Sequence, residues 1–296
     1  MSSDPKARVA TSVREKLLTL AKSKGVVYDM VLNRYALERF LYRLSISPSK
    51  SDLVLKGAML FQIWNREPHR ATRDLDLLAR GATNPETIEK TLRSICEVEV
   101  EEDGLSIDKQ SILVTAIREE AEYGGFRAKF IVRLGSAKIP VQIDFGFGDA
   151  ITPAATESIY PTLLGMSEPV LFVYPRETVV AEKLEAIVRL GMDNSRMKDY
   201  FDLWFIATTY QDDTSTLTHA ISETFHRRRQ PVPGEIPVGL TDSFATDPQK
   251  QRQWRAFLDR AVGSSLSLQE VVQAVRSFAT PLFEGAWQIS LDRIAP

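Results

Sequence analysis

The amino-acid sequence predicts an α+β fold: a mixed sheet with helices, followed by a helical half. Two observations favour this class. Between residues 53 and 147, short apolar runs alternate with polar residues, which is typical of strands. After Pro175 the apolar residues recur at the spacing of helices. The character changes near Val173, so we expect a first domain of residues 1–173, with N-terminal helices and the sheet, and a helical domain of residues 174–296.

Composition sets limits on the class of protein. The chain has 296 residues, 44% of them hydrophobic, which suits about two globular domains. The formal net charge of -2 gives no overall basic balance, so any contact with nucleic acid must use local patches. Cys96 is the single cysteine, which rules out an intrachain disulfide and fits a cytoplasmic protein. We see no signal peptide and no run long enough to cross a membrane, so we expect no membrane partner.

The N-terminal region reads as two helices. Ser12 fits the start of a capping box, and Gly25 fits the end of that first helix. A second helix is expected from Asp29 to Leu44, followed by a linker over Ser45–Ser51. A third amphipathic run, Asn84–Cys96, begins with Asn84 as a helix cap.

The remaining elements follow from the same periodicities. The strands we expect cover residues 53–55, 74–77, 106–108, 112–117, 127–134 and 139–147. The helices we expect in the second half cover residues 177–190, 194–208, 217–228, 248–262 and 268–283.

The stretch from residue 53 to residue 78 organises the chain. In a strand, Asp74 and Asp76 point to one face while Leu75 and Leu77 point to a core. Two carboxylates about 7 Å apart can hold divalent cations between them. A solvated, charged edge strand is the alternative, but the flanking leucines favour a partly buried site that needs a compensating cation.

A turn precedes this pair of carboxylates. Lys56 and Gly57 end an apolar run, and Ala58 begins a helix-like run that reaches Asn65. Glycine at such a turn lets a phosphate approach the backbone N–H groups. A phosphate cradle followed by two carboxylates suggests a site for a nucleotide with its metal ion.

A third carboxylate, Asp144, lies within an otherwise apolar strand. It shares a face with Gly146 and Gly148, whose small size leaves room for a ligand. The alternative is a buried aspartate paired with an arginine. Together with Asp74 and Asp76, it completes the carboxylate set that two-metal phosphoryl transfer commonly uses.

The helical half offers a second group of charges. Lys183 borders an apolar helix face and could contact a triphosphate, although a solvated lysine is the commoner outcome. Asp199 and Asp202 are three residues apart on one helix face and could orient Lys183 or an attacking hydroxyl, or act as simple cap or ion-pair residues. The basic run of residues 226–229 is expected to be a solvated helix end.

The ordered set of motifs resembles the AbiEii/AbiGii family of nucleotidyltransferase-like toxins. The matching segments are Lys56-Gly57, residues 70–77 with Arg70 and Thr72 before the two aspartates, 141–144, 182–184 and 198–203, with further similarity over 237–254. The resemblance implies a DNA-polymerase-beta-like nucleotidyltransferase core and a helical C-terminal half. It implies a toxin of a type IV toxin–antitoxin system, with a separate antitoxin that is often of a winged-helix, AbiEi-like kind.

The resemblance also implies roles for particular residues. Transfer of a nucleotide from NTP to an acceptor such as the 3′ end of tRNA would use Mg²⁺ or Mn²⁺ held by Asp74, Asp76 and Asp144. Nucleotide binding would involve Lys56, Gly57, Ala58, Arg70, Thr72 and Lys183, and the catalytic set would include Lys183, Asp199 and Asp202. The family usually has a second glycine and a hydroxyl residue where this chain has Ala58 and Met59, which removes one phosphate contact that Thr72 could partly replace.

Two other functions use the same residues. A metal-dependent nuclease would cleave nucleic acid without NTP, but it needs no triphosphate cradle at Gly57. A non-catalytic nucleotide-binding regulator would keep the fold and lose turnover, and the change at Ala58 and Met59 favours it.

Overall fold

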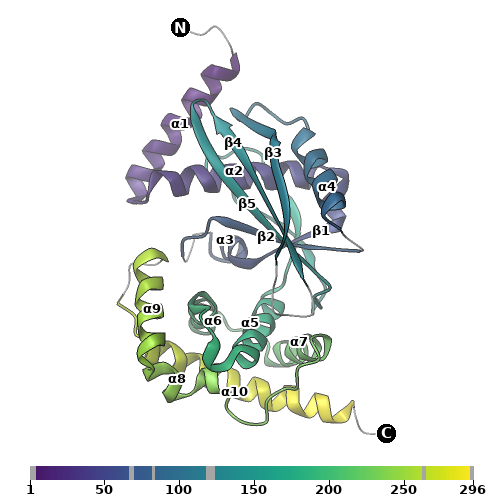
Figure 1. Ribbon diagram of the computed structural model, residues 1–296, viewed down its shortest axis with the longest axis vertical. Helices are drawn as coiled ribbons and strands as arrows, with labels where there is room; N and C mark the ends of the chain where they lie inside the picture. Colours follow the sequence, from purple (N-terminus) through teal and green to yellow (C-terminus); the bar gives the residue numbers. More distant parts are fainter. Residues whose placement is uncertain (1–4, 67–69, 82–83, 118–123, 262–264, 294–296) are drawn as a thin grey trace. The chain divides into compact units, whose positions relative to one another are not determined.

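The computed structural model describes residues 5–66, 70–81, 84–117, 124–261 and 265–293. The chain divides into two compact units (Figure 1). The first contains Met1–Pro68, Thr72–Gly148 and Thr156–Val173; the second contains His69–Ala71, Asp149–Ala155 and Tyr174–Pro296. Residues 70–71 and 149–155 belong to the second unit, together with the helices that begin at Arg176.

The first unit is built on a seven-stranded mixed sheet in the order β3-β4-β5-β2-β1-β7-β6. The strands are β1 Leu53–Lys56, β2 Asp74–Ala79, β3 Leu105–Ile117, β4 Gly125–Leu134, β5 Ala137–Phe147, β6 Thr156–Ile159 and β7 Val170–Val173. The β2–β5 and β1–β7 pairs are parallel and the others are antiparallel. With the helices below, this arrangement confirms the predicted α+β class.

One face of the sheet forms the core of this unit. Leu75, Leu77 and Ile143 are fully buried, and they alternate with half-buried polar residues on the other face. Helices α2 (Tyr28–Ser45) and α4 (Pro85–Glu97) pack against the apolar face (Figure 1). The ring centroids of Phe40 in α2 and Phe130 in β4 are 6.0 Å apart.

Helix α1 (Pro5–Lys24) packs on α2. In α4, the single thiol of Cys96 is buried, and burial raises its pKa to about 12.

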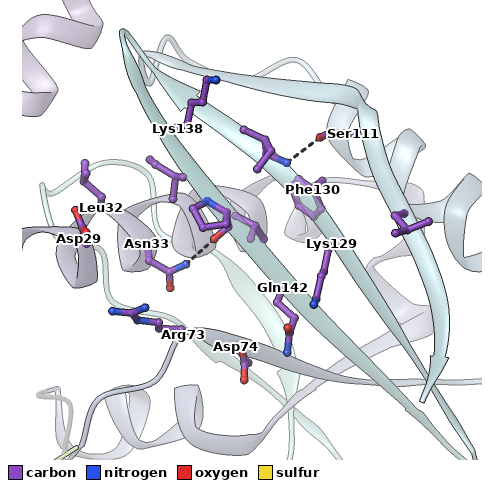
Figure 2. Close-up of a pocket in the computed structure, with 15 residues that line it drawn as sticks. Asp29, Leu32, Asn33, Arg73, Asp74, Ser111, Lys129, Phe130, Lys138 and Gln142 are labelled. Carbon is purple, nitrogen blue, oxygen red and sulfur yellow. Dashed lines mark hydrogen bonds between the residues drawn. The ribbon is translucent and has the colours of Figure 1, made fainter. Parts of the chain in front are cut away.

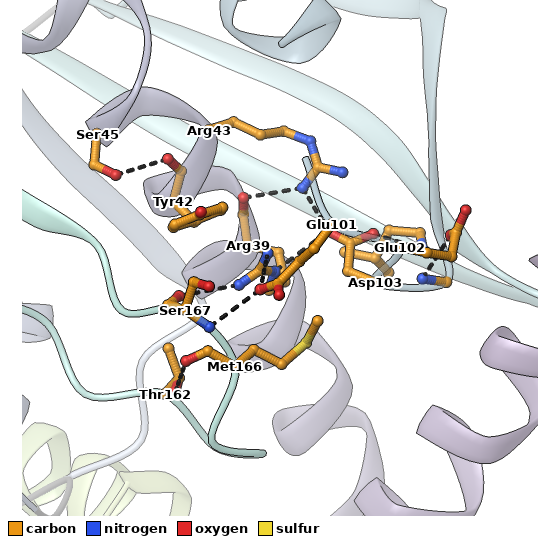
Figure 3. Close-up of polar contacts among 12 residues, drawn as sticks. Arg39, Tyr42, Arg43, Ser45, Glu101, Glu102, Asp103, Thr162, Met166 and Ser167 are labelled. Atoms are coloured by element: carbon orange, nitrogen blue, oxygen red, sulfur yellow. Dashed lines mark hydrogen bonds and ion pairs between the residues drawn. The ribbon is translucent and has the colours of Figure 1, made fainter. Parts of the chain in front are cut away.

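A buried ion-pair network fixes α2 to two loops (Figure 3). The fully buried guanidinium of Arg39 donates to Asp103 at 3.3 Å, to Glu101 at 3.3 Å and to the carbonyl of Ser167 at 3.2 Å. Arg43 reaches the same Asp103 carboxylate at 2.7 Å. Because two guanidiniums share this carboxylate, the loop before β3 is held firmly against α2.

The second unit is helical. Its α-helices are α5 Arg176–Leu190, α6 Met197–Thr209, α7 Thr214–Arg227, α8 Asp242–Thr246, α9 Pro248–Ala261 and α10 Leu268–Asp292. Helices α5 and α7 pack together, as do α10 and both α6 and α7. Within the described residues of the whole chain, no helix combines the length and apolar character that crossing a bilayer requires.

Several predicted boundaries are wrong. Ser12 lies inside α1, seven residues after its start at Pro5, so it is no cap. The two strands expected at 106–108 and 112–117 are one strand, β3, with an irregularity between Asp108 and Leu113. Part of the expected linker at Ser45–Ser51 is a 3-10 helix, η1 Pro48–Asp52.

Other elements were missed or mis-sized. The short elements β6, β7 and α8 were not predicted. Helix α10 contains Pro281 and ends at Asp292, nine residues after the predicted end at Phe283. Val262, the expected end of the helix predicted over residues 248–262, lies outside the described residues.

Candidate active site

Three carboxylates lie on one face of two neighbouring strands. Asp74 and Asp76 are half-buried in β2, while Leu75 between them is fully buried on the opposite face. In the parallel β2–β5 pair, Asp76 is opposite Asp144, and Asp74 is opposite Gln142. The structure therefore brings together the three aspartates that the sequence singled out.

Gly57 is needed for the position of Asp76. Lys56, the last residue of β1, is the strand partner of Asp76, and Gly57 follows it with φ +76°. A Cβ atom built on Gly57 would lie 2.0 Å from Oδ2 of Asp76. Only glycine therefore allows this carboxylate to lie directly over the backbone of the turn.

The helix-like run after Gly57 is partly a 3-10 turn. Residues Gly57–Met59 form η2, and α3 (Leu60–Asn65) follows. Ala58 and Met59 are buried. Thr72 stands near the start of β2, where its hydroxyl donates to the carbonyl of Asp74 at 3.4 Å.

An arginine that the sequence analysis did not single out joins this face. Arg127 in β4 is the strand partner of Asp144 and binds both of its carboxylate oxygens, at 2.8 and 2.7 Å. These hydrogen bonds, followed by the negative charges of Asp144, Asp74 and Asp76, raise the pKa of Arg127. All three aspartates therefore act electrostatically on the Arg127 guanidinium. The Arg127–Asp144 ion pair is the aspartate–arginine pairing that the sequence left open as the alternative role of Asp144.

The donor set of this face suits a hard divalent cation. Carboxylate oxygens are the protein ligands that Mg²⁺ prefers, and Asp74 and Asp76 project from the same strand face. Within the described part of the chain, no group of three His, Cys, Asp or Glu side chains is already arranged around a common metal position. Both oxygens of Asp144 already accept hydrogen bonds from Arg127, so a cation at Asp144 would compete with this ion pair.

The second unit contains a separate, buried charge cluster. Lys183 in α5 lies 2.7 Å from Asp199 and 2.8 Å from Asp202, both in α6. Arg70 binds both oxygens of Asp202, at 2.6 and 2.9 Å, and Arg196 lies 2.8 Å from Asp199. Asp199 and Asp202 are almost completely buried, and the Lys183 side chain is 13% exposed and paired with both, so the alternative of a solvated lysine is wrong.

The electrostatics of this buried cluster favour the charged forms of Lys183 and Asp199. Burial acts to lower the pKa of Lys183, but the charges of Asp199 and Asp202 outweigh it and raise the pKa. Burial acts to raise the pKa of Asp199, but Lys183 and Arg196 outweigh it and lower the pKa. The cluster is a compact set of opposite charges in a low-dielectric setting.

The basic run of residues 226–229 is not a simple solvated helix end. Arg228 lies 2.5 Å from Glu185, 3.0 Å from Asp149 and 3.7 Å from Glu182, and its side chain is mostly buried. Burial acts to lower the pKa of Arg228, but these carboxylates raise it. Arg228, which follows α7, therefore links the end of α7 to two glutamates of α5. It also links α7 to Asp149, which lies between β5 and β6.

Comparisons with known proteins show what this chain is similar to. The sequence profile described as "Nucleotidyl transferase AbiEii toxin, Type IV TA system" matches residues 39–280. No curated protein matches the chain. Among solved structures, JHP933 from Helicobacter pylori is 15% identical, with a TM-score of 0.48 over 88% of this chain and 95% of its own. A candidate nucleotidyltransferase from H. pylori is also 15% identical, with a TM-score of 0.47 over 87% of this chain and 96% of its own.

Proposed function

Because this chain belongs to the AbiEii family of nucleotidyl transferase toxins from type IV toxin–antitoxin systems, we propose that it transfers a nucleoside monophosphate from NTP to the 3′ end of tRNA. Such a transfer would block translation. Membership of a toxin–antitoxin family implies an antitoxin counterpart. We propose that this counterpart is of the winged-helix kind, and that the enzyme acts in the cytoplasm, where NTP and tRNA are found.

The observation that carries this proposal is the carboxylate face beside Gly57. Asp74, Asp76 and Asp144 stand on adjacent strands, and Asp76 lies against the turn at Gly57. These three residues would hold Mg²⁺ or Mn²⁺. When bound, the cation supplies Lewis-acid stabilisation of the charge that develops on the phosphoryl oxygens.

The proposed transfer needs only NTP and the acceptor hydroxyl as reactants. The acceptor hydroxyl oxygen forms a bond to the α-phosphorus of NTP, while the bond from that phosphorus to the bridging oxygen breaks. Pyrophosphate leaves with the electron pair. The hydroxyl proton passes to a carboxylate of Asp74, Asp76 or Asp144, and then to water.

Other residues of the chain have supporting roles in this proposal. Lys56, Gly57, Ala58 and Thr72 would border the triphosphate. Arg127 would neutralise Asp144 until the nucleotide and its cation bind. In the helical unit, Asp199 and Asp202 keep Lys183 protonated and Arg70 fixes Asp202, so this cluster would hold α5 and α6 together.

A nucleotide-binding regulator without turnover is the second candidate. The bidentate Arg127–Asp144 pair favours it, because this pair satisfies a carboxylate that the transfer reaction needs. The two candidates differ in one measurable outcome, since both bind NTP but only the transferase releases pyrophosphate.

The test is a labelling reaction. Purified protein is incubated with Mg²⁺, total RNA and each α-labelled NTP in turn, beside the Asp74→Ala variant. We expect label on tRNA with one or more NTPs, and none with Asp74→Ala. Equal labelling by both proteins, or no labelling of any RNA, would overturn the proposal. NTP binding without labelling would establish the regulator.

A further inference from the structure

A groove with a volume of about 530 Å³ opens next to Asp74 and is lined by residues of β3, β4, β5 and the start of α2 (Figure 2). Strand β2 begins at Asp74, opposite Gln142, so the first part of β5 extends past it. The N-terminal turns of α2 border this extension, where the side-chain amide of Asn33 donates to the carbonyl of Pro140 at 3.1 Å. The groove follows β5 from Gln142 to Lys138, roughly 13 Å of strand.

The floor and walls of the groove differ in character. Leu113, Ile131 and Pro140 supply an apolar floor, and the Leu113 side chain is notably exposed for its size. Lys129 and Lys138 are exposed and place two ammonium groups along it (Figure 2). An apolar platform lined by cations suits a chain of phosphates and flat bases.

Asn33 gives independent evidence for a ligand. Its side chain is only 7% exposed. Its Oδ1 atom has no hydrogen-bond partner among the described residues. In Figure 2 this oxygen points toward the end of the groove at Arg73 and Asp74. A buried acceptor costs free energy when it is unpaired, so a ligand with an N–H or O–H group would stabilise the site.

We infer that this groove binds the single-stranded end of a polynucleotide acceptor and directs its terminal hydroxyl to Asp74. The inference rests on the proposed transfer reaction for the identity of that hydroxyl. Phosphates contact Lys129 and Lys138, bases lie on the apolar floor, and a base amine or ribose hydroxyl donates to Asn33. Gly57, where the triphosphate is proposed to bind, adjoins Asp76 on the β1 side, whereas the groove extends along β5 and β4. The two substrates therefore approach the carboxylates from different strands.

Direct binding tests the groove without relying on turnover. The probe is a 5′-fluorescein-labelled oligoribonucleotide of six nucleotides, followed by fluorescence anisotropy from 25 to 200 mM salt without NTP. The variants are Lys129→Gln, Lys138→Gln and Gln142→Leu; the matched control is Lys90→Gln, an exposed lysine of α4 outside the groove. Each groove lysine variant should weaken binding several-fold and lower the slope of log K against log[salt] by about 0.7. Gln142→Leu removes an uncharged polar side chain that lines the groove opposite Asp74, so it should weaken binding with the slope unchanged.

Three results of the binding experiment would overturn the inference. The first is wild-type protein that does not bind the oligonucleotide. The second is a Lys129→Gln/Lys138→Gln double variant that binds like wild type. The third is displacement of the oligonucleotide by Mg-ATP alone, which would make the groove the NTP site. Failure of the transfer reaction is a separate result, because oligonucleotide binding is measured without NTP. Transfer of the nucleotide to a protein instead of RNA would also overturn the proposed role of the groove, but it would leave nucleotidyl transfer itself intact.

Discussion

The two charge clusters of this protein contain the same kinds of residue in opposite settings. On the sheet of the first unit, Asp74 and Asp76 are half-buried, and the Asp144 side chain is 19% exposed. In the helical unit, the Asp199 and Asp202 side chains are 1% and 0% exposed and are enclosed by Lys183, Arg70 and Arg196. Exposure leaves the first cluster accessible to a cation and substrate, whereas burial makes the second depend on its own ion pairs.

The comparison separates two roles for an aspartate. A half-buried carboxylate can exchange one partner for another, because water and incoming ions reach it. A buried carboxylate between fixed cations cannot lose a partner without leaving an uncompensated charge. We therefore expect substitutions in the first cluster to abolish activity with little loss of stability, and substitutions in the second to destabilise the fold.

The largest effect is expected for Asp76→Asn. This variant keeps the shape of the side chain and removes the charge that would bind the metal ion. We expect nucleotidyl transfer to fall by about 10³-fold, since metal-held charge stabilisation supplies several kcal/mol to such transition states. Initial rates with labelled NTP give the measurement, and the melting temperature should change little. Asp259→Asn, in the exposed part of α9, is the control and should keep wild-type rates.

The next effect concerns the buried cluster. Asp202→Ala leaves Lys183 and Arg70 without their shared carboxylate, so we expect the free energy of unfolding to fall by about 3–5 kcal/mol. Urea denaturation followed by circular dichroism measures it. Asp242→Ala removes an exposed carboxylate paired with Arg276 and should cost less than about 1 kcal/mol. Equal losses in both variants would contradict the distinction between the clusters.

Gly57→Ala tests how tightly the first cluster is built. The added Cβ would meet Oδ2 of Asp76 at 2.0 Å, so the carboxylate must move. A misplacement of about 1 Å can reduce a catalytic rate about 10²-fold. Gly25→Ala is the matched control, because Gly25 has a similar φ of +64° with no atom within 4 Å of the added Cβ. Both variants carry backbone strain, but only Gly57→Ala should lose activity beyond its loss of stability.

The smallest effect is a pH dependence of stability that arises from Glu38, a buried carboxylate outside both clusters. Glu38 in α2 is buried and accepts the backbone N–H of Leu163 at 2.9 Å. Burial raises the pKa of Glu38 to about 8, against the opposing effects of that hydrogen bond and of Arg34 and Arg39. Between about pH 4.5 and pH 8, the folded state therefore keeps a proton that the unfolded chain has lost.

Stability should fall as pH rises through this window, by at most about 1.4 kcal/mol per pH unit. Urea unfolding at pH 5.5, 6.5 and 7.5 measures the slope, and Glu38→Gln should flatten it. A variant with the wild-type slope would show that Glu38 is ionised in the folded protein. Such a result would place it with Asp199, a buried carboxylate whose pKa is lowered by its cationic neighbours.

Sequence periodicity identified the regular elements that carry long apolar patterns. The alternation of Leu75 and Leu77 with Asp74 and Asp76 was enough to assign both faces of β2. The short strands β6 and β7 escaped detection, because four residues give too little alternation. Ser12 was mistaken for a cap because α1 begins upstream in a polar segment that shows little apolar periodicity.

Those residues of the candidate site that a local sequence pattern marks could be predicted. Asp74, Asp76 and Asp144 were found because each stands out in an apolar strand. Arg127 was missed because its partner, Asp144, is set by the register of β4 on β5, which no local pattern specifies. The signal available was the alternation of Arg127 and Lys129 with buried Ala128 and Phe130, which marks a charged strand face.

The burial of Cys96 in α4 has a practical consequence. With its pKa near 12, the thiol has almost no reactive thiolate at neutral pH in the folded protein. An alkylating reagent can therefore modify it only when the segment around α4 opens. The chain has no other cysteine. The rate of alkylation, followed by mass spectrometry, therefore measures how fast the sheet unit opens and contains no signal from the helical unit.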